Sequence, residues 1–190
     1  MYQLLDLYQD KLELPPPVKD SFGRIISDEA VDKYEARCGI ALALGQISKH
    51  LGKDKVAPLF SFFVPEGLND RHVNVRKMML EAAQMALEDH GKDCVSELLP
   101  VFEKFLAEAP KTREYDAVRQ SVVILMGSLA KHLNKDDPKV KPIVAKLTET
   151  LSTPSQQVQE AVANCLPPLV PAIKSEAPDM AKKLLRLLLG

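Results

Sequence analysis

Histidine and cysteine are the residue types of this chain that could serve as nucleophiles, general bases or metal ligands. Cys38, Cys94 and Cys165 lie far apart in the sequence, and their wide spacing matches no zinc motif, redox pair or disulfide framework. Glu88–His90 holds two carboxylates and an imidazole, but consecutive residues on one helical turn cannot converge as a catalytic triad. We therefore expect buried, reduced thiols, and we expect no enzyme, no metal site and no cofactor.

Lysine clusters are the remaining candidates, because ammonium groups bind phosphate and carboxylate. Two clusters fall in loops at equivalent positions of an internal repeat. Their candidate partner-binding residues are Lys49, Lys53, Lys55, Lys131, Lys135, Lys139 and Lys141. We expect both loops at one edge of the fold, where a basic edge can follow a phosphate backbone. No aromatic residue is interleaved, so stacking on bases is not expected. A solvated rim of loops without a partner is the alternative.

Composition limits what such a partner can be. The chain has 190 residues, of which 46% are hydrophobic and 27% charged, as in ordinary folded proteins. Its 25 Lys and Arg and 26 Asp and Glu give a net charge of −1, whereas a general nucleic-acid-binding domain is usually much more basic. No apolar run approaches the roughly 18 residues of a membrane span, and no signal peptide is visible. We expect a cytoplasmic protein that recognises any charged partner through a local patch.

An internal repeat organises the chain. The residues that end one recurring tripeptide are Arg37, Arg76, Arg119 and Gln159, which are nearly evenly spaced. A second series, out of phase with the first, consists of the equally spaced prolines Pro58, Pro100 and Pro142. Both series have a period of roughly 40 residues, which is typical of solenoids in which stacked units bury a continuous core.

Each repeat is expected to contain two helices. Counted from the arginine positions, apolar residues recur at offsets 4, 7, 10 and 14, which form one stripe on a helix. This second helix should end, in successive repeats, at Gly52, Gly91 and Asn134. The first helix should begin at the N-cap candidates Asp54, Asp93 and Asp137. The repeated prolines should bend the first helix.

The two ends of the chain depart from this pattern. We expect an amphipathic helix over Tyr2–Glu13 and then a first helix over Val18–Ser27. The prolines within residues 167–171 should kink or break the last second helix near Leu166. A further amphipathic helix is expected over Ala181–Leu189, with no partner after it. The chain thus stops in mid-unit, as an excerpt from a longer protein would.

These features predict an all-α fold, a right-handed α-solenoid of HEAT repeats with about four helix pairs and partial terminal units. HEAT units are favoured because each repeat shows two helices, with a proline in the first. We expect one solenoid segment over residues 1–190. Its approximate units are 1–52, 53–91, 92–134 and 135–174, followed by a partial unit 175–190.

Arginine and aspartate recur in the turns between the two helices of the repeats. The residues concerned are Arg37, Asp70, Arg76, Asp116 and Arg119. We expect them to pair within one turn or between adjacent turns. Such a ladder is structural, because it sets the angle at which units stack, and it does not by itself indicate a binding site.

Several stretches of the chain resemble one known family. They are Asn69–His72 with Val75–Lys77, Tyr115–Val123 with Leu125–Leu133, Asp137–Leu147, Leu151–Glu160 and Cys165–Lys174. They resemble the giant HEAT-repeat activator of the general amino-acid control kinase, the family of general control non-derepressible protein one. The resemblance covers nearly the whole chain. It implies an internal fragment just before, or at the start of, a region similar to the HEAT part of fungal elongation factor three.

The resemblance implies a non-catalytic scaffold segment of a ribosome-binding protein that activates the kinase of initiation factor two in amino-acid starvation and ribosome stalling. The implied partners are the ribosome, through its RNA or its proteins, and an ABC-type ATPase. The kinase contact is expected elsewhere in the parent chain, and neither a membrane nor a small-molecule substrate is expected. Two alternatives remain open: a passive structural spacer, and a generic protein-binding HEAT scaffold of the transport-receptor or phosphatase-scaffold type.

Overall fold

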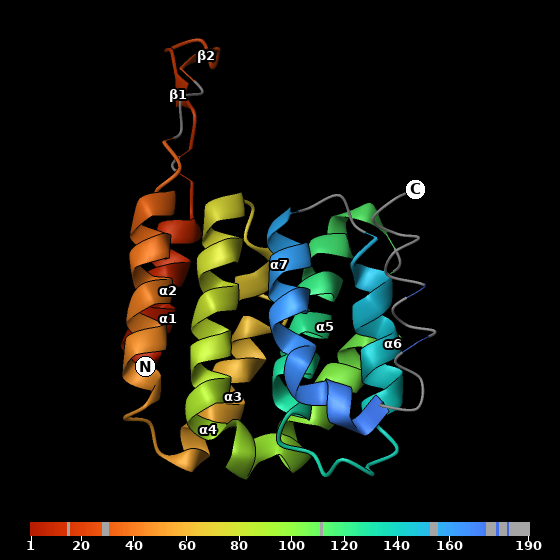
Figure 1. The fold of residues 1–190 in the computed structure, drawn as a ribbon. Coiled ribbons are helices and arrows are strands. Elements are labelled where there is room, and N and C mark those ends of the chain that lie inside the picture. The colour runs from red at the N-terminus through yellow and green to blue at the C-terminus, as the bar shows by residue number, and fades with distance from the viewer. Residues whose placement is uncertain are drawn as a thin grey trace.

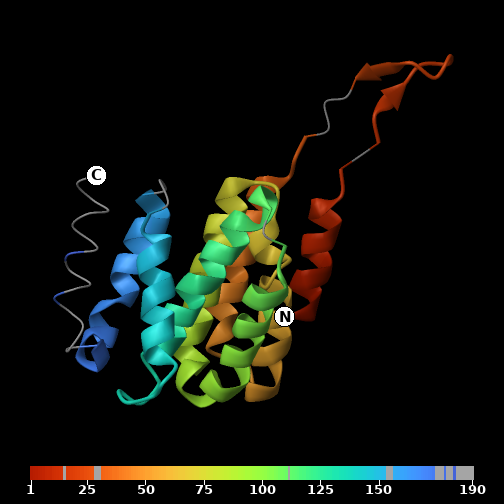
Figure 2. The ribbon, with the colours of Figure 1, turned by 90° about the vertical axis from the view of Figure 1, so that its right-hand side faces the viewer.

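The computed structural model describes residues 1–14, 16–27, 31–110, 112–152 and 156–173, together with residues 178 and 182. Within them the chain is an all-α solenoid with one short β-hairpin near its N-terminus (Figures 1 and 2). The α-helices are α1 (Tyr2–Leu12), α2 (Tyr34–Ser48), α3 (Lys53–Phe63), α4 (Val73–Glu108), α5 (Asp116–Ala130), α6 (Val140–Thr150) and α7 (Gln156–Cys165). The hairpin strands are β1 (Val18–Lys19) and β2 (Ile25–Ser27), and the 3-10 helices are η1 (Gly67–Asn69), η2 (Arg113–Tyr115) and η3 (Pro167–Ile173).

One continuous core runs through the stack of helices. Helix α1 packs against α2, α3 against α4, and α5 against α4, α6 and α7. Phe60 of α3 lies edge-on to Phe63 and to Phe102 of α4, with ring centroids 5.6 and 5.8 Å apart, and all three rings are fully buried. Such contacts join successive helix pairs, as expected for a solenoid in which no single pair can bury its apolar face alone.

Helix α4 corrects the predicted helix boundary at Gly91. The 36 residues of Val73–Glu108 are helical throughout, with a bend but no loop between the two halves, so Gly91 does not end a helix and Asp93 does not cap one. The helix folds back at the lower edge of the molecule in Figure 1, and its two halves occupy neighbouring positions in the stack. The glycine has a packing role instead, because a Cβ at position 91 would lie 2.9 Å from the imidazole of His132.

The other predicted second-helix ends are also shifted. Helices α2 and α5 end at Ser48 and Ala130, before Gly52 and Asn134. Both continue as tighter turns: His50 N–H donates to the Ile47 carbonyl at 2.9 Å after α2, and His132 N–H donates to the Leu129 carbonyl at 3.1 Å after α5. Such turns satisfy the last carbonyls of a helix without a left-handed residue.

The segment Val18–Ser27, predicted to be a first helix, is instead the antiparallel hairpin β1–β2. Helix α1 takes the place of the first helix beside α2, and its prediction over Tyr2–Glu13 is confirmed. The sequence carried turn signals that outweigh helical periodicity here. Asp20 is followed by Gly23, which has a φ of 77°, and β-branched Val18, Ile25 and Ile26 flank them.

The prolines and caps agree with the prediction in part. Helix α7 ends at Cys165 and η3 follows from Pro167, so the predicted break near Leu166 is confirmed. Asp137 accepts the Lys139 N–H at 2.9 Å just before α6. Asp54 lies inside the first turn of α3, after the N-cap residue Gly52. The helix expected over residues 181–189 falls almost entirely outside the described residues.

A buried ion network fixes the N-terminal helices. Arg37 of α2 is fully buried, and its Nε and Nη2 donate to the two oxygens of Asp70 at 2.8 and 3.0 Å. Its Nη1 donates to Asp32 at 2.6 Å and to the carbonyl of Lys11 at 3.0 Å. Tyr8 of α1 donates its hydroxyl hydrogen to Asp70 at 2.7 Å. One guanidinium therefore links α1, α2 and the turn that precedes α4.

The other ladder residues do not repeat this arrangement. Arg76 donates to the backbone carbonyls of Asp70 and Arg71, at 2.7 and 3.1 Å, and not to a carboxylate. Arg119 pairs with Asp116 three residues earlier and donates to the carbonyl of Pro110. Arg37 thus joins two helix pairs, whereas Arg76 and Arg119 each stabilise a local turn.

Replacing Arg37 tests how much this network contributes. We expect Arg37→Met to lower the free energy of unfolding by about 3–5 kcal/mol, because it leaves the buried carboxylate of Asp70 without its cation. The matched variant Arg119→Met, at a partly exposed pair, should cost less than about 1 kcal/mol. Urea denaturation followed by circular dichroism measures both. Equal losses would contradict the special position of Arg37.

The network also predicts acid sensitivity. Hydrogen bonds from Arg37 and Arg71 hold the pKa of Asp32 well below its ordinary value. Burial by itself raises the pKa of Asp70. Hydrogen bonds from Arg37 and Tyr8 outweigh the effect of burial, so the pKa of Asp70 is also lowered. Both carboxyls therefore protonate more readily in the unfolded chain, so the stability they contribute at neutral pH is lost as the pH falls below about 4.

Substituting Asp32 should reduce this acid sensitivity. We expect the free energy of unfolding of Asp32→Asn to fall less steeply between roughly pH 5 and pH 2 than that of the unmodified chain. Asp116→Asn is the control, because that carboxylate is half exposed and belongs to a local turn. Urea denaturation at a series of pH values gives the slopes. An unchanged slope in Asp32→Asn would remove this residue from the acid response.

Candidate functional site

The structure brings the two predicted lysine clusters to one edge of the solenoid. Lys49, Lys53 and Lys55 lie at the α2–α3 connection, and the second cluster lies at the α5–α6 connection and in the first turn of α6. Both connections, with the bend of α4 between them, form the lower edge of the molecule in Figures 1 and 2. We call this surface, made of residues 49–55, 88–93 and 131–139, the lower edge.

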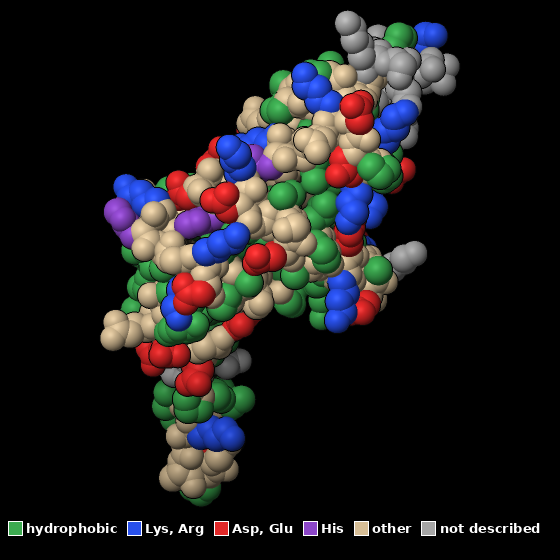
Figure 3. Space-filling model, turned by 90° about the horizontal axis from the view of Figure 1, so that it is seen from below, with side chains coloured by type: hydrophobic (Ala, Val, Ile, Leu, Met, Phe, Trp, Pro, Cys, Tyr) green, Lys and Arg blue, Asp and Glu red, His purple; other side chains and the backbone are tan. Residues whose placement is uncertain are grey.

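Acidic side chains neutralise much of the lower edge. Its three segments contain seven lysines and six aspartates or glutamates. Figure 3 views the molecule from this side and shows basic, acidic and histidine side chains interspersed. Lys55 lies 3.3 Å from Asp54, and Lys139 lies 3.1 Å from Glu103. The lower edge is therefore a mixed surface, and its attraction for phosphate is weaker than the lysines alone suggested.

Individual lysines of this edge differ in what they can offer a partner. Lys131 is paired with Glu88 of α4. Lys49, Lys53 and Lys135 are exposed and form no ion pair with any residue that the structure describes. These three lysines are spread over both connections, and a fourth lysine without an ion pair among the described residues, the exposed Lys92, lies on α4 between them. Lys141, in the first turn of α6 and just beyond the lower edge, is also exposed.

Histidine and serine tie the lower edge together. Ser48, at the end of α2, donates to Asp89 at 2.8 Å, and His90 Nε2 lies 2.7 Å from the Ser48 carbonyl oxygen. His132 packs where α4 bends, and its buried Nε2 has no hydrogen-bond partner among the described residues. Burial, with a smaller contribution from the charge of Lys131, lowers the pKa of His132. These contacts hold α2, α4 and α5 in register.

The cysteines are unsuited to nucleophilic chemistry. Cys94 and Cys165 are buried, whereas Cys38 is only partly buried, contrary to the expectation of three buried thiols. Burial raises the pKa of all three thiols, which keeps them in the less reactive protonated form. The described residues contain no cluster of three or more His, Cys, Asp or Glu side chains that could hold a metal ion.

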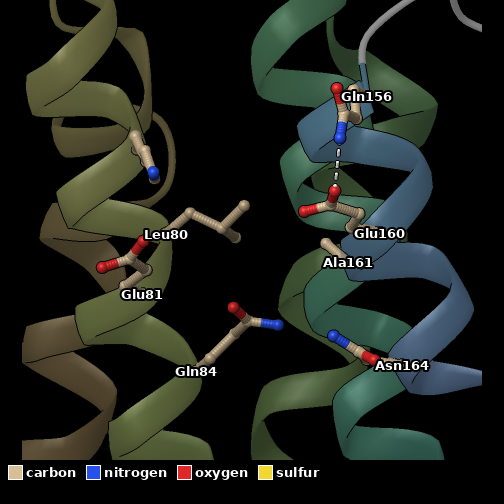
Figure 4. A pocket seen from close by; sticks show the side chains of 8 residues that line it. Leu80, Glu81, Gln84, Gln156, Glu160, Ala161 and Asn164 are labelled. Carbon is tan, nitrogen blue, oxygen red and sulfur yellow. Dashed lines mark hydrogen bonds between the residues drawn. The ribbon is translucent and has the colours of Figure 1, made fainter.

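A polar groove between α4 and α7 is a surface that the sequence did not predict. Its volume is about 430 Å³, and Figure 4 shows Gln84 and Asn164 pointing into it from opposite walls. Gln156 donates to Glu160 at 2.8 Å on the α7 wall. A smaller hollow of about 130 Å³ shares Gln84 and Asn164 and continues the groove over α5. Side-chain amides in such a position can donate to and accept from a peptide backbone.

The stacked helices define the class of protein to which the chain belongs, which is an α-solenoid of HEAT repeats. No helix in the described part combines the length and apolar character needed to cross a membrane.

Comparison with known sequences gives the family. The family described as "Stalled ribosome sensor GCN1, HEAT repeats" matches residues 1–131, and the chain belongs to this family. It is 63% identical to the human "Stalled ribosome sensor GCN1" over 189 residues, which cover all of this chain and 7% of the human protein. It is 46% identical to "Protein ILITYHIA" of Arabidopsis thaliana over 150 residues, 78% of this chain and 6% of that protein.

A yeast relative extends the comparison. The "eIF-2-alpha kinase activator GCN1" of Saccharomyces cerevisiae is 33% identical over 192 residues, which cover 98% of this chain and 7% of the yeast protein. The chain therefore spans only a small fraction of the length of its relatives. No solved structure matches the chain.

Reversing the charge of Lys49, Lys53 and Lys135 should leave the fold intact. We expect the triple variant Lys49→Glu, Lys53→Glu, Lys135→Glu to change the free energy of unfolding by less than about 1 kcal/mol, because exposed side chains without fixed partners contribute little. Urea denaturation measures the change. A larger loss would show that these lysines belong to the fold and would disqualify the variant from binding experiments.

Proposed function

We propose that this chain is a non-catalytic scaffold segment of a cytoplasmic, ribosome-associated activator of the eIF-2-alpha kinase. The observation that carries the proposal is the 63% identity, over the whole chain, to a relative named as a stalled ribosome sensor. The name of the yeast relative adds the kinase. The buried thiols and the paired ionisable side chains of the core fit a scaffold, since scaffolds act through surfaces and not through a reacting group.

The lower edge is the part of this segment that we assign to the ribosome. Lys49, Lys53 and Lys135 are exposed at both of its connections and are free of ion pairs with the described residues. Lysines in this position can displace counterions from ribosomal RNA or pair with acidic ribosomal proteins. We assign the kinase contact to another part of the parent chain, and an ABC-type ATPase is a further partner of the same scaffold.

Two other functions compete with this assignment. A passive spacer is favoured by the near balance of charge on the lower edge, which limits electrostatic attraction. A protein-binding scaffold is favoured by the polar groove between α4 and α7, whose amide side chains suit an extended peptide. The ribosome contact differs from both because it must weaken as salt increases.

Co-sedimentation with purified ribosomes over a salt series tests the assignment. We expect this chain to pellet with ribosomes at low salt and to be released as salt rises, because each phosphate contact adds to the salt dependence. The triple reversal Lys49→Glu, Lys53→Glu, Lys135→Glu should weaken binding roughly tenfold and reduce the salt slope.

A second triple variant controls for net charge. Lys33, Lys77 and Lys104 are exposed and lie outside the segments that form the lower edge. Their reversal to Glu makes the same change in net charge and should leave most of the ribosome binding intact. No pelleting of the unmodified chain at the lowest salt would favour the spacer. Equal weakening by both triple variants would remove the lower edge from the interface.

A further inference from the structure

Exposed apolar side chains are concentrated in the hairpin that projects from the solenoid. Among the described residues, 13 large apolar side chains are exposed, and six of them fall between residues 14 and 31. They are Leu14, Val18, Phe22, Ile25, Ile26 and Val31. Phe22 at the tip is 80% exposed, the largest fraction in this set. Apolar side chains scattered singly are ordinary on a protein surface, but a concentration on one projection indicates an interaction site.

The tip of the hairpin is held in one conformation. Asp20 Oδ1 accepts hydrogen bonds from the backbone N–H groups of Phe22 and Arg24, at 2.9 and 2.8 Å. The Gly23 N–H donates to the carbonyl of Asp20 at 3.0 Å, and the Asp20 N–H donates to the carbonyl of Arg24 at 2.8 Å. The Arg24 guanidinium lies over the Phe22 ring, 5.5 Å from its centroid. A tip ordered in advance loses less entropy when it binds.

The solenoid itself does not cover this apolar surface. In two perpendicular views the hairpin stands clear of the helices, at the end of the molecule opposite to the lower edge (Figures 1 and 2). Its two strands pair only with each other among the described residues. An isolated two-stranded hairpin is marginally stable in water and leaves both of its edges unpaired. Ile25 and Ile26 point to opposite faces of β2 and are both more than half exposed, so a partner could bury either face.

We propose that the hairpin β1–β2 inserts Phe22 into an apolar cleft of a ribosomal protein whose rim carries a carboxylate for Arg24. This proposal rests on the proposed function for the ribosome as the partner. The side chain of Arg24 is 77% exposed and lies 3.6 Å from Asp20, so it remains available to a second acidic group. Aromatic residues, phenylalanine among them, and arginine are both enriched in protein interfaces.

The charge of the hairpin and its flanking residues favours a protein partner over RNA or an anionic membrane. Residues 14–32 contain two cations, Lys19 and Arg24, against four acidic residues. Phosphate backbones and anionic membranes both attract lysine and arginine and repel carboxylates. The aliphatic side chains of Val18, Ile25 and Ile26 have no function against a phosphate surface, whereas they add buried area in a protein cleft. The hairpin therefore suits an apolar protein surface on which Arg24 meets a single carboxylate.

Photo-crosslinking from position 22 tests the proposal. The full-length protein, with a benzophenone-bearing phenylalanine in place of Phe22, is bound to purified ribosomes, pelleted and irradiated. We expect a crosslink to a ribosomal protein, and a clear reduction of that crosslink in Ile26→Ser. The same photoreactive residue in place of Val101, an exposed apolar position on α4, should give no such product. The hairpin substitutions should not alter folding, because these side chains are exposed.

Each other outcome overturns the proposal in a distinct way. A crosslink from position 22 to ribosomal RNA assigns the tip to nucleic acid. A crosslink within the same chain, or to a second copy of it, means that the protein covers its own hairpin. Pelleting without any crosslink from position 22 removes the hairpin from the contact but leaves the ribosome-binding function standing. If the full-length protein does not pellet, the proposed function fails, and this inference fails with it.

The variant Phe22→Ser gives a quantitative check. We expect it to lower the ribosome affinity of the full-length protein about tenfold, as truncation of an anchoring aromatic residue commonly does. Val101→Ser is the matched control and should leave the affinity unchanged. Equal affinities of Phe22→Ser and the unmodified protein would contradict an anchoring role for the ring.

Discussion

The buried guanidinium of Arg37 constrains the whole N-terminal half of the structure. A cation that is completely removed from solvent is tolerated only when every donor finds an acceptor. Here two carboxylates and one carbonyl surround it, from the segment before α2, from the turn before α4 and from the end of α1. Displacing any of these elements would expose an unpaired charge to the core. The stacking of the first two helix pairs therefore follows from one side chain and its partners.

Small residues impose a second constraint further along the stack. A Cβ on Gly127 of α5 would lie 2.9 Å from the side chain of Leu147 and 3.0 Å from Cys165. A Cβ on Gly45 of α2 would lie 3.2 Å from the Ala82 backbone of α4. These glycines let neighbouring helices approach closely, and close approach leaves little freedom in crossing angle. Ion pairing and the steric contact at Gly45 both fix the first pairs of the solenoid, and the steric contact at Gly127 fixes later ones.

Sequence alone predicts the repeated part of this fold well because periodic apolar residues report burial directly. Prediction from the sequence is wrong where the structure at one position depends on a turn or on a contact with a distant residue. The sequence predicts a helix end at Gly91, but this residue lies within α4, where the absence of a side chain lets His132 pack against the bend. The turn chemistry of Asp20 and Gly23 outweighs a weak helical pattern in the hairpin. The expected ladder allows Arg37 to pair with Asp70 of the adjacent turn, but no local pattern indicates that Tyr8 and Asp32 join the same network. The polar groove is lined by residues of α4 and α7, which are far apart in the sequence, so the pattern of neither helix predicts it.

The lower edge and the hairpin lie on opposite sides of the solenoid and differ in their chemistry. The lower edge carries mixed charge, so the ribosome contact that we propose for it consists of individually weak, salt-sensitive interactions. The hairpin at the other end is apolar and ordered in advance, so its contacts depend little on salt. Because both sit on one continuous core, the affinity of either contact raises the effective concentration of the other. Such a scaffold binds firmly only to a partner that offers a site for each surface at the matching distance. The requirement for both sites adds specificity to a lower edge that is weakly specific alone.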